Sequence, residues 1–215
     1  MQTEQVLQFH FLRAAACSSN LLIVQALLKR DIVAVDDYLT GEAASAVKHE
    51  YIGGGVYAMA GATVEHNQIA FNFASAFRIH LKGKPCRTFI SDVKVRLQIK
   101  GEDVFYYPDV MVGCDKRDTN RLYLQYPRLL VEVASDSTER LDRGEKRLAY
   151  QTIETLEEYV IAAQDRIEAT VFRRAANWNS ELFTRSEQII KLDSISLALP
   201  LSTLYDGVIP AALAP

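Results

Sequence analysis

The sequence has few cysteines, and no spacing ties them together. Its 215 residues include three, Cys17, Cys86 and Cys114, and none of them forms a CxxC pair. A disulfide framework in a secreted protein uses a denser and paired set of cysteines. We therefore expect free thiols in a reducing compartment.

The sequence also lacks an excess of positive charge and a long hydrophobic run. Its formal net charge is -3 and its sequence pI is about 5.8, whereas nucleic-acid-binding proteins are typically basic overall or along one face. Any DNA contact must therefore come from a local basic patch. No window reaches the roughly 18 uninterrupted apolar residues of a membrane span. The first residues include a glutamate and no Lys or Arg before Arg13, unlike a signal peptide. We expect a cytoplasmic protein without membrane contact.

The hydrophobic content of 49% over 215 residues is enough for the core of one domain with an appendage. Leu21, Val24 and Leu28 have helical spacing, and the pattern of apolar and polar residues changes near Asp31. We expect residues 1–30 to form an accessory helix or arm, and residues 31–215 to form the main domain.

Alternating helix and strand patterns follow along the main domain. Three glycines at 53–55 separate two strand-like arms, and Ile69, Phe73 and Phe77 recur at helical spacing. Strand-like runs come next at 86–99, 104–113 and 127–135, then a capped helix with Asp136 and Glu139 as a capping box. Two more strands, at 156–163 and 167–175, precede a turn at 177–180. This order predicts an α/β fold with helices packed on a sheet.

Two acidic residues lie inside apolar strand-like runs. Asp109 follows a proline in "VFYYPDVMVG", and Glu132 is flanked by Leu and Val in "LLVEVAS". If the two strands are neighbours, like charges about 4 Å apart repel by roughly 4 kcal/mol at an effective dielectric constant of 20. A divalent cation such as Mg²⁺ removes this repulsion, because it binds carboxylate oxygens and substrate phosphate together.

A lysine in the next helix supplies the matching positive charge. Lys146 shares a helical stripe with Asp142, Ala149, Tyr150 and Ile153, so it is expected to face the sheet. Other cations lie on more exposed faces of the same helix, where they can contact the phosphate backbone of DNA; these are Arg140, Arg143 and Arg147.

The segments "SDVKVRL", "YYPDVMVG", "PRLLVEVASDSTERLDRGEKRLAY" and "LEEYVIAA" together resemble the bacterial family of "putative restriction endonucleases", a branch of the PD-(D/E)xK nuclease superfamily. The resemblance runs from about Val33 to Val208. It implies a restriction-endonuclease-like fold, with a mixed central sheet flanked by helices over the main domain. It also implies that Asp109 and Glu132 bind Mg²⁺, with Mn²⁺ as a substitute, and that a lysine assists attack of water on a phosphodiester bond in DNA.

One position departs from the superfamily pattern. The lysine usually found two residues after the second acid is replaced by Ala134. The family resembled here takes its lysine from the following helix, which gives the catalytic set Asp109, Glu132 and Lys146, with Lys94 as the next candidate. The resemblance further suggests Glu50 as a third acid near the metal. Residues expected near the substrate are His66, Gln68, Arg143 and Arg147.

Two alternatives to a nuclease, and one question of oligomeric state, remain open from the sequence. Glu132 and Lys146 can form a buried salt bridge in a binding module without catalytic activity. A metal-free hydrolase such as a glycosidase also uses two carboxylates, but it explains neither Lys146 nor the arginines beside it. A homodimer is compatible with double-strand cleavage, which needs two active sites.

Overall fold

The computed structural model describes residues 32–135 and 141–208. Several predictions therefore lie outside the described residues. They concern the arm at 1–30, the state of Cys17, the exposure of Arg140, and the capping box of Asp136 and Glu139.

The central sheet is mixed and six-stranded. In spatial order its strands are β11 (Ser180–Phe183), β10 (Ala169–Arg173), β9 (Glu158–Ala163), β8 (Pro127–Ala134), β6 (Val110–Gly113) and β3 (Arg87–Ile90). Strands β8 and β9 pair in parallel, and the other neighbours pair antiparallel. The expected α/β class and mixed sheet are confirmed.

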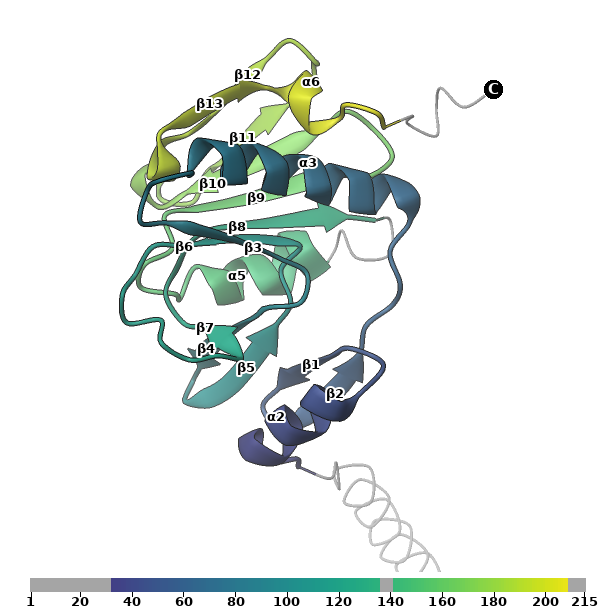
Figure 1. Ribbon diagram of the computed structural model, residues 1–215, viewed down its shortest axis with the longest axis vertical. Helices are drawn as coiled ribbons and strands as arrows, with labels where there is room; N and C mark the ends of the chain where they lie inside the picture. Colours follow the sequence, from purple (N-terminus) through teal and green to yellow (C-terminus); the bar gives the residue numbers. More distant parts are fainter. Residues whose placement is uncertain (1–31, 136–140, 209–215) are drawn as a thin grey trace, which may run out of the picture.

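Helix α3 (Val64–His80) covers one face of this sheet (Figure 1). The Thr63 hydroxyl caps it by accepting a hydrogen bond from the His66 backbone amide at 3.2 Å. The predicted apolar stripe of Ile69, Phe73 and Phe77 is completely buried. The same core includes residues of β12 (Ile189–Leu192), η3 (Asp193–Ile195), β13 (Leu197–Pro200) and α6 (Leu201–Leu204).

The opposite face carries a short helical segment and a second sheet (Figure 1). The segment is one π-helical turn, η1 (Asp142–Lys146), continued by α5 (Arg147–Tyr150). The second sheet has the order β2 (Gly55–Ala58), β1 (His49–Ile52), β5 (Glu102–Tyr106), β4 (Lys94–Ile99) and β7 (Tyr123–Leu124). The predicted hairpin at the three glycines is therefore confirmed as β1 and β2.

Helix α2 (Val35–Ala44) is attached to the second sheet by aromatic contacts. The Tyr38 ring lies 5.0 Å from that of Tyr51 and 5.4 Å from that of Phe105. Its hydroxyl donates a 2.6 Å hydrogen bond to the carbonyl of His49. Helix α2 therefore packs against strands β1 and β5 of the second sheet.

Two of the predicted strand runs are each divided between the two sheets, which corrects their interpretation as single strands. The run at 104–113 breaks after Tyr106, because Pro108 has no amide to donate to a continuing ladder. The run at 86–99 breaks at Ser91, which has a positive φ of 37°. At each break the chain crosses from one sheet to the other. The Ser91 amide donates to the Asp109 carbonyl at 3.0 Å, so these two crossings lie side by side.

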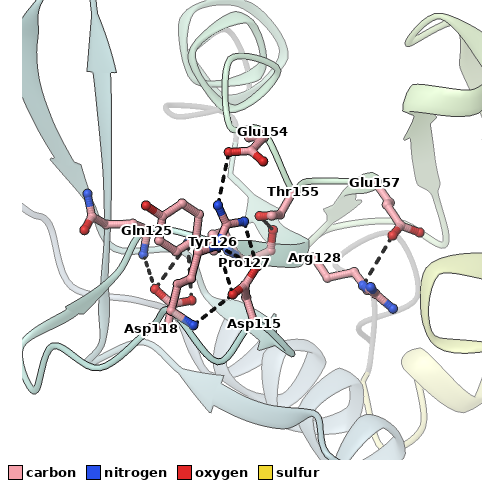
Figure 2. A network of polar contacts seen from close by, with 10 residues as sticks. Asp115, Asp118, Gln125, Tyr126, Pro127, Arg128, Glu154, Thr155 and Glu157 are labelled. Atoms are coloured by element: carbon pink, nitrogen blue, oxygen red, sulfur yellow. Dashed lines mark hydrogen bonds and ion pairs between the residues drawn. The ribbon is translucent and has the colours of Figure 1, made fainter.

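A polar network holds the connection between β6 and β8 (Figure 2). The Asp118 carboxylate accepts hydrogen bonds from the backbone amides of Gln125 and Tyr126. Thr155 donates to the Pro127 carbonyl at 2.9 Å, and Arg128 pairs with Glu157 at 3.3 Å. These contacts fix the start of β8, and with it the position of every later residue on that strand.

The expectation of free thiols is wrong for two of the cysteines. Cys86 and Cys114 form a disulfide with their Cα atoms 4.2 Å apart. Cys86 directly precedes β3 and Cys114 directly follows β6, and these strands pair antiparallel with Arg87 opposite Gly113. The bond therefore joins the paired ends of an edge strand and its neighbour, which lie far apart in sequence.

No helix within 32–135 or 141–208 has both the length and the apolar character needed to cross a membrane.

The disulfide predicts a simple thiol count and a loss of stability on reduction. Unfolded without reductant, the chain should expose one titratable thiol (3 − 2 = 1), and all three after reduction. Reduction should lower the free energy of unfolding by about 3 kcal/mol, because a loop with a sequence separation of 28 residues is no longer closed in the unfolded chain. Thiol titration and urea denaturation measure both effects. Three reactive thiols without reductant would contradict the bond.

Candidate active site

Lys146 lies at the centre of a buried acidic cluster. Its Nζ atom is 3.0 Å from Glu50 Oε1, 3.3 Å from Glu132 Oε1 and 3.7 Å from Asp142 Oδ1. All four residues are buried. The Tyr150 hydroxyl donates to Glu132 Oε1 at 2.7 Å, which fixes that carboxylate from a second side.

Three separate elements bring this cluster together. Glu132 lies on β8, where side chains alternate, so it shares a face with Leu130 and Ala134 and points toward α5. Asp142 and Lys146 are four residues apart in η1 and lie on one side of that turn. Glu50 comes from β1 of the second sheet. The site therefore exists only when the second sheet is docked on the first.

Asp109 lies beside the cluster, at the crossing that Pro108 creates. Its Oδ2 atom accepts a 2.7 Å hydrogen bond from the Val133 amide and lies 3.2 Å from His66 Nε2. Val133 directly follows Glu132, so the two predicted acidic residues are held next to one another. His66 reaches Asp109 from the first turn of α3. Asp109 therefore links helix α3 to strand β8 of the central sheet.

The charges in the cluster do not balance. Glu50, Glu132 and Asp142 surround a single ammonium, so the cluster holds three carboxyl groups for one positive charge. Burial alone would lower the pKa of Lys146, but the surrounding carboxylates outweigh it and raise that pKa far above its usual value. Lys146 therefore stays protonated at any physiological pH.

On the pKa of the Glu132 carboxyl group, burial acts in the opposite direction. Burial raises the pKa of Glu132 well above its usual value, and the charges of Asp142 and Asp109 add to the increase, although Lys146 opposes it. For His66, burial lowers the pKa, but the hydrogen bond and charge of Asp109 outweigh it, so the net shift is upward. Glu132 thus retains a proton more readily than an exposed glutamate does.

A buried glutamate elsewhere in the chain shows what a structural acid looks like. Glu158 pairs with Arg173 at 3.1 Å and accepts hydrogen bonds from the backbone amides of Asp193 and Ser194. The Ser194 hydroxyl donates to it as well. Each Glu158 oxygen thus has its own donors, whereas Glu50 Oε1 is buried without a hydrogen bond and contacts Lys146 only as an ion pair.

These residues bring carboxylate oxygens near one another without enclosing a metal ion. Across the described segments, no three His, Cys, Asp or Glu side chains converge closely enough to enclose a metal ion. Magnesium, however, binds through one or two carboxylates and keeps several waters. Asp109, Glu132 and Glu50 supply such carboxylates, and the excess negative charge of the cluster favours a divalent cation. The residues present therefore fit Mg²⁺.

The structure brings five of the predicted site residues together; these are Asp109, Glu132, Lys146, Glu50 and His66. It does not bring Gln68 to them, because the Gln68 amide donates to Asn72 at 2.9 Å. Asn72 in turn donates to the carbonyls of Leu204 and Asp206 and so ties α3 to the C-terminal part of the described chain.

The remaining predicted cations lie apart from the carboxylates. Arg143 donates to Thr170 and Glu168 on or beside β10, and Arg147 lies over the ring of Phe172. Both are more exposed than Lys146, as expected. The alternative lysine, Lys94, is buried but donates to the Tyr107 hydroxyl at 3.0 Å.

Asp142 and Tyr150 belong to the site but were not predicted as site residues. Their signal was present in the sequence, because both share the helical stripe of Lys146. That spacing places them on the correct face, yet it cannot show that Tyr150 reaches across to Glu132, 18 residues earlier on another element.

Comparisons with known proteins agree with this geometry. The family model Uma2, described as "Putative restriction endonuclease", matches residues 35–202. The uncharacterized protein slr1290 of Synechocystis sp. is 33% identical over 176 residues, which cover 80% of this chain and 91% of that protein. Protein sll1609 of the same organism is 32% identical over 136 residues, 62% of this chain and 76% of that protein.

A solved structure has the same fold. It is described as a putative nuclease belonging to DUF820 from Anabaena variabilis, and it superposes with a TM-score of 0.68. The match covers 82% of this chain and 99% of that one, at 17% sequence identity.

The contrast between the two buried glutamates can be tested by stability. Glu132 has a folded-state pKa above its unfolded value, so ionising it costs stability as the pH rises from the unfolded pKa through the folded one. Glu132→Gln should match the parent at acidic pH and exceed its free energy of unfolding by about 1 kcal/mol or more at neutral pH. Urea denaturation at both pH values, without divalent metal, measures the difference.

Glu158→Gln is the matched control. It should lose about 3 kcal/mol at neutral pH, because it breaks a buried ion pair with Arg173. Equal losses in the two variants would show that Glu132 is an ordinary structural acid.

Proposed function

Since the chain belongs to the Uma2 family, whose description is "Putative restriction endonuclease", we propose that it is a metal-dependent endonuclease that hydrolyses phosphodiester bonds in DNA. One observation carries the proposal: a protonated Lys146 is buried among more carboxylates than it can neutralise, beside Asp109. A buried ion pair contributes little to stability, so this excess of charge is better explained by a ligand that offsets it.

Asp109 and Glu132 would hold Mg²⁺, with Mn²⁺ as a substitute, and Glu50 is the third acid in reach of the same place. When bound, such an ion would polarise a phosphoryl oxygen and make the attacking water more acidic. The hydrogen bond from the Val133 amide orients Asp109 for this role, and the Tyr150 hydroxyl orients Glu132.

Lys146 supplies the fixed positive charge. Because its pKa is raised, the ammonium remains charged and is held in place by three carboxylates before substrate arrives. A positioned donor of this kind stabilises the negative charge that develops on the phosphoryl group in the transition state, or orients the attacking water. Its neighbours Arg143 and Arg147 lie on the more exposed side of the same segment, where they can contact the phosphate backbone.

Glu132 links metal binding to pH. Because its pKa is raised, this carboxylate gives up its proton less readily than an exposed glutamate in the metal-free site. Coordination requires the ionised form, so binding should release that proton and strengthen as the pH rises. His66 Nε2 lies 3.2 Å from the neighbouring Asp109 oxygen and helps to orient that carboxylate.

A module that binds DNA without cutting it is the competing function. The direct contacts between Lys146 and the carboxylates favour it, because they occupy oxygens that a metal would use. Metal affinity separates the two functions.

Calorimetry tests the metal site. The parent chain should bind Mn²⁺ or Mg²⁺ with proton release, and the affinity should rise between acidic and neutral pH. Asp109→Asn and Glu132→Gln should each weaken binding at least tenfold. Asp92→Asn, at an exposed acid that pairs with Lys48, should leave it unchanged. Equal affinity in all four proteins would rule out the proposed metal site and leave the silent binding module.

Two buried lysines provide a matched test of catalysis. Lys146→Met keeps the aliphatic stem but removes the ammonium, and cleavage of plasmid DNA in Mg²⁺ should fall about a hundredfold or more. Lys94→Met removes an equally buried ammonium that donates to Tyr107 rather than to the carboxylates, and should cut at close to the parental rate. A loss in Lys94→Met alone would transfer the catalytic role to Lys94.

A further inference from the structure

A pocket of about 470 Å³ lies where the segment 142–147 meets the hairpin of β10 and β11. Its lining includes Arg143, Arg147, Phe172, Trp178, Asn179 and Leu182. Small-molecule sites typically measure about 300–1,000 Å³, so the volume suits one organic group. The lining combines cations, aromatic rings and an amide. A buried core would lack the cations, and a simple basic patch would lack the aromatic rings.

The pocket shares a face of the central sheet with the acidic cluster. Glu132 is paired with Ile161, Ile161 with Thr170, and Thr170 with Leu182, so the four residues form one row across β8, β9, β10 and β11. Paired residues point to the same face, and neighbouring strands lie about 4.8 Å apart. Thr170, which lines the pocket, is therefore about 10 Å from Glu132. One DNA strand can reach both places.

The two arginines of the pocket differ in their partners. Arg143 is held by Glu168 at 2.7 Å and by Thr170 at 3.0 Å. Arg147 donates to the carbonyl of Arg143 and lies 5.3 Å from the centre of the Phe172 ring, and no carboxylate in the described ranges forms an ion pair with it. The charge of Arg147 thus remains available to an anionic ligand.

Trp178 occupies a backbone position that suits it poorly. Its φ is 60°, directly after Asn177 at 52°. Asparagine tolerates the left-handed region, but a bulky side chain there is an outlier and costs roughly 1–2 kcal/mol. The ring is half-buried, lines the pocket, and lies 5.2 Å from the guanidinium of Arg174. A glycine would relieve the backbone strain, so the tryptophan is kept at this turn by its side-chain contacts, which are with the apolar core, with Arg174 and with the pocket.

From these observations we infer that the pocket binds an unpaired nucleobase of the DNA strand, stacked on Trp178, with Arg147 contacting an adjacent phosphate. Aromatic side chains stack on bases of any sequence when the base faces are accessible. In a duplex those faces are covered by neighbouring pairs, so only a single-stranded or flipped nucleotide can enter such a pocket. The inference rests on the proposed function and specifies its substrate class: single-stranded DNA, or duplex DNA with unpaired nucleotides.

The chain has one tryptophan, so its fluorescence reports on this pocket directly. The full chain, in EDTA to prevent cleavage, is titrated with an oligothymidylate and separately with a blunt duplex of equal length. Oligothymidylate should quench Trp178 saturably, and the duplex should bind at least tenfold more weakly. Absence of quenching by oligothymidylate, or equal affinity for both DNAs, would overturn the inference.

Substitutions at position 178 separate binding from folding. Trp178→Gly should remain folded but lose some free energy of unfolding, because glycine adopts the positive φ without strain while the packing of the half-buried ring on the core is lost. Its affinity for labelled oligothymidylate, measured by fluorescence anisotropy, should fall about 5- to 150-fold, the change that corresponds to one stacked base. Trp178→Phe should retain most of the affinity. If Trp178→Gly binds single strands as tightly as the parent, the pocket does not stack a base.

The outcome is independent of the metal test. Quenching by oligothymidylate in a chain that binds no Mn²⁺ would support the pocket and reject the nuclease. Metal binding and plasmid cleavage without quenching would support the nuclease and reject the pocket.

Discussion

The structure depends on the burial of one ammonium among three carboxylates. Removing a charge from water costs several kcal/mol per ion even after the protein relaxes, so Lys146, Glu50, Glu132 and Asp142 must be supported by everything around them. Glu50 comes from the second sheet and Glu132 from the first, so the cluster forms only when the two sheets are packed together. The apolar cluster that both sheets share holds that packing, and it includes the contact of the Tyr106 ring with that of Tyr150.

The two chain crossings explain how Asp109 reaches this place. At Pro108 and at Ser91 the backbone leaves one sheet and enters the other, and the hydrogen bond between Ser91 and Asp109 keeps the crossings adjacent. A carboxylate within a continuous strand would point into one core or the other. At the crossing it points instead toward Val133 and His66, beside the buried charges but outside the apolar layers. The proline that interrupts the strand therefore also positions the acid.

Segment 142–147 directs side chains both to the acidic cluster and to the pocket beside β10 and β11. Asp142 and Lys146 face the buried carboxylates, and Arg143 and Arg147 face the hairpin of β10 and β11. A single π-helical turn carries Asp142, Arg143 and Lys146, and Arg147 follows it as the first residue of α5. Such turns recur at functional sites. A strand held by the arginines would lie along the same face of the sheet as Glu132.

Local patterns in the sequence determined the helix 64–80, the hairpin at the glycines, the mixed α/β class and the facing side of Lys146, because periodicity and turn residues act over a few positions. They also gave Asp109 and Glu132, since a carboxylate within an apolar run is visible without any structure. Only the tertiary structure decided what depends on distant parts of the chain. It joined Cys86 to Cys114, divided two strand runs between sheets, turned Gln68 toward Asn72, and placed Tyr150 on Glu132. Such contacts depend on how the packed layers meet, and the spacing of residues within a single segment does not predict them.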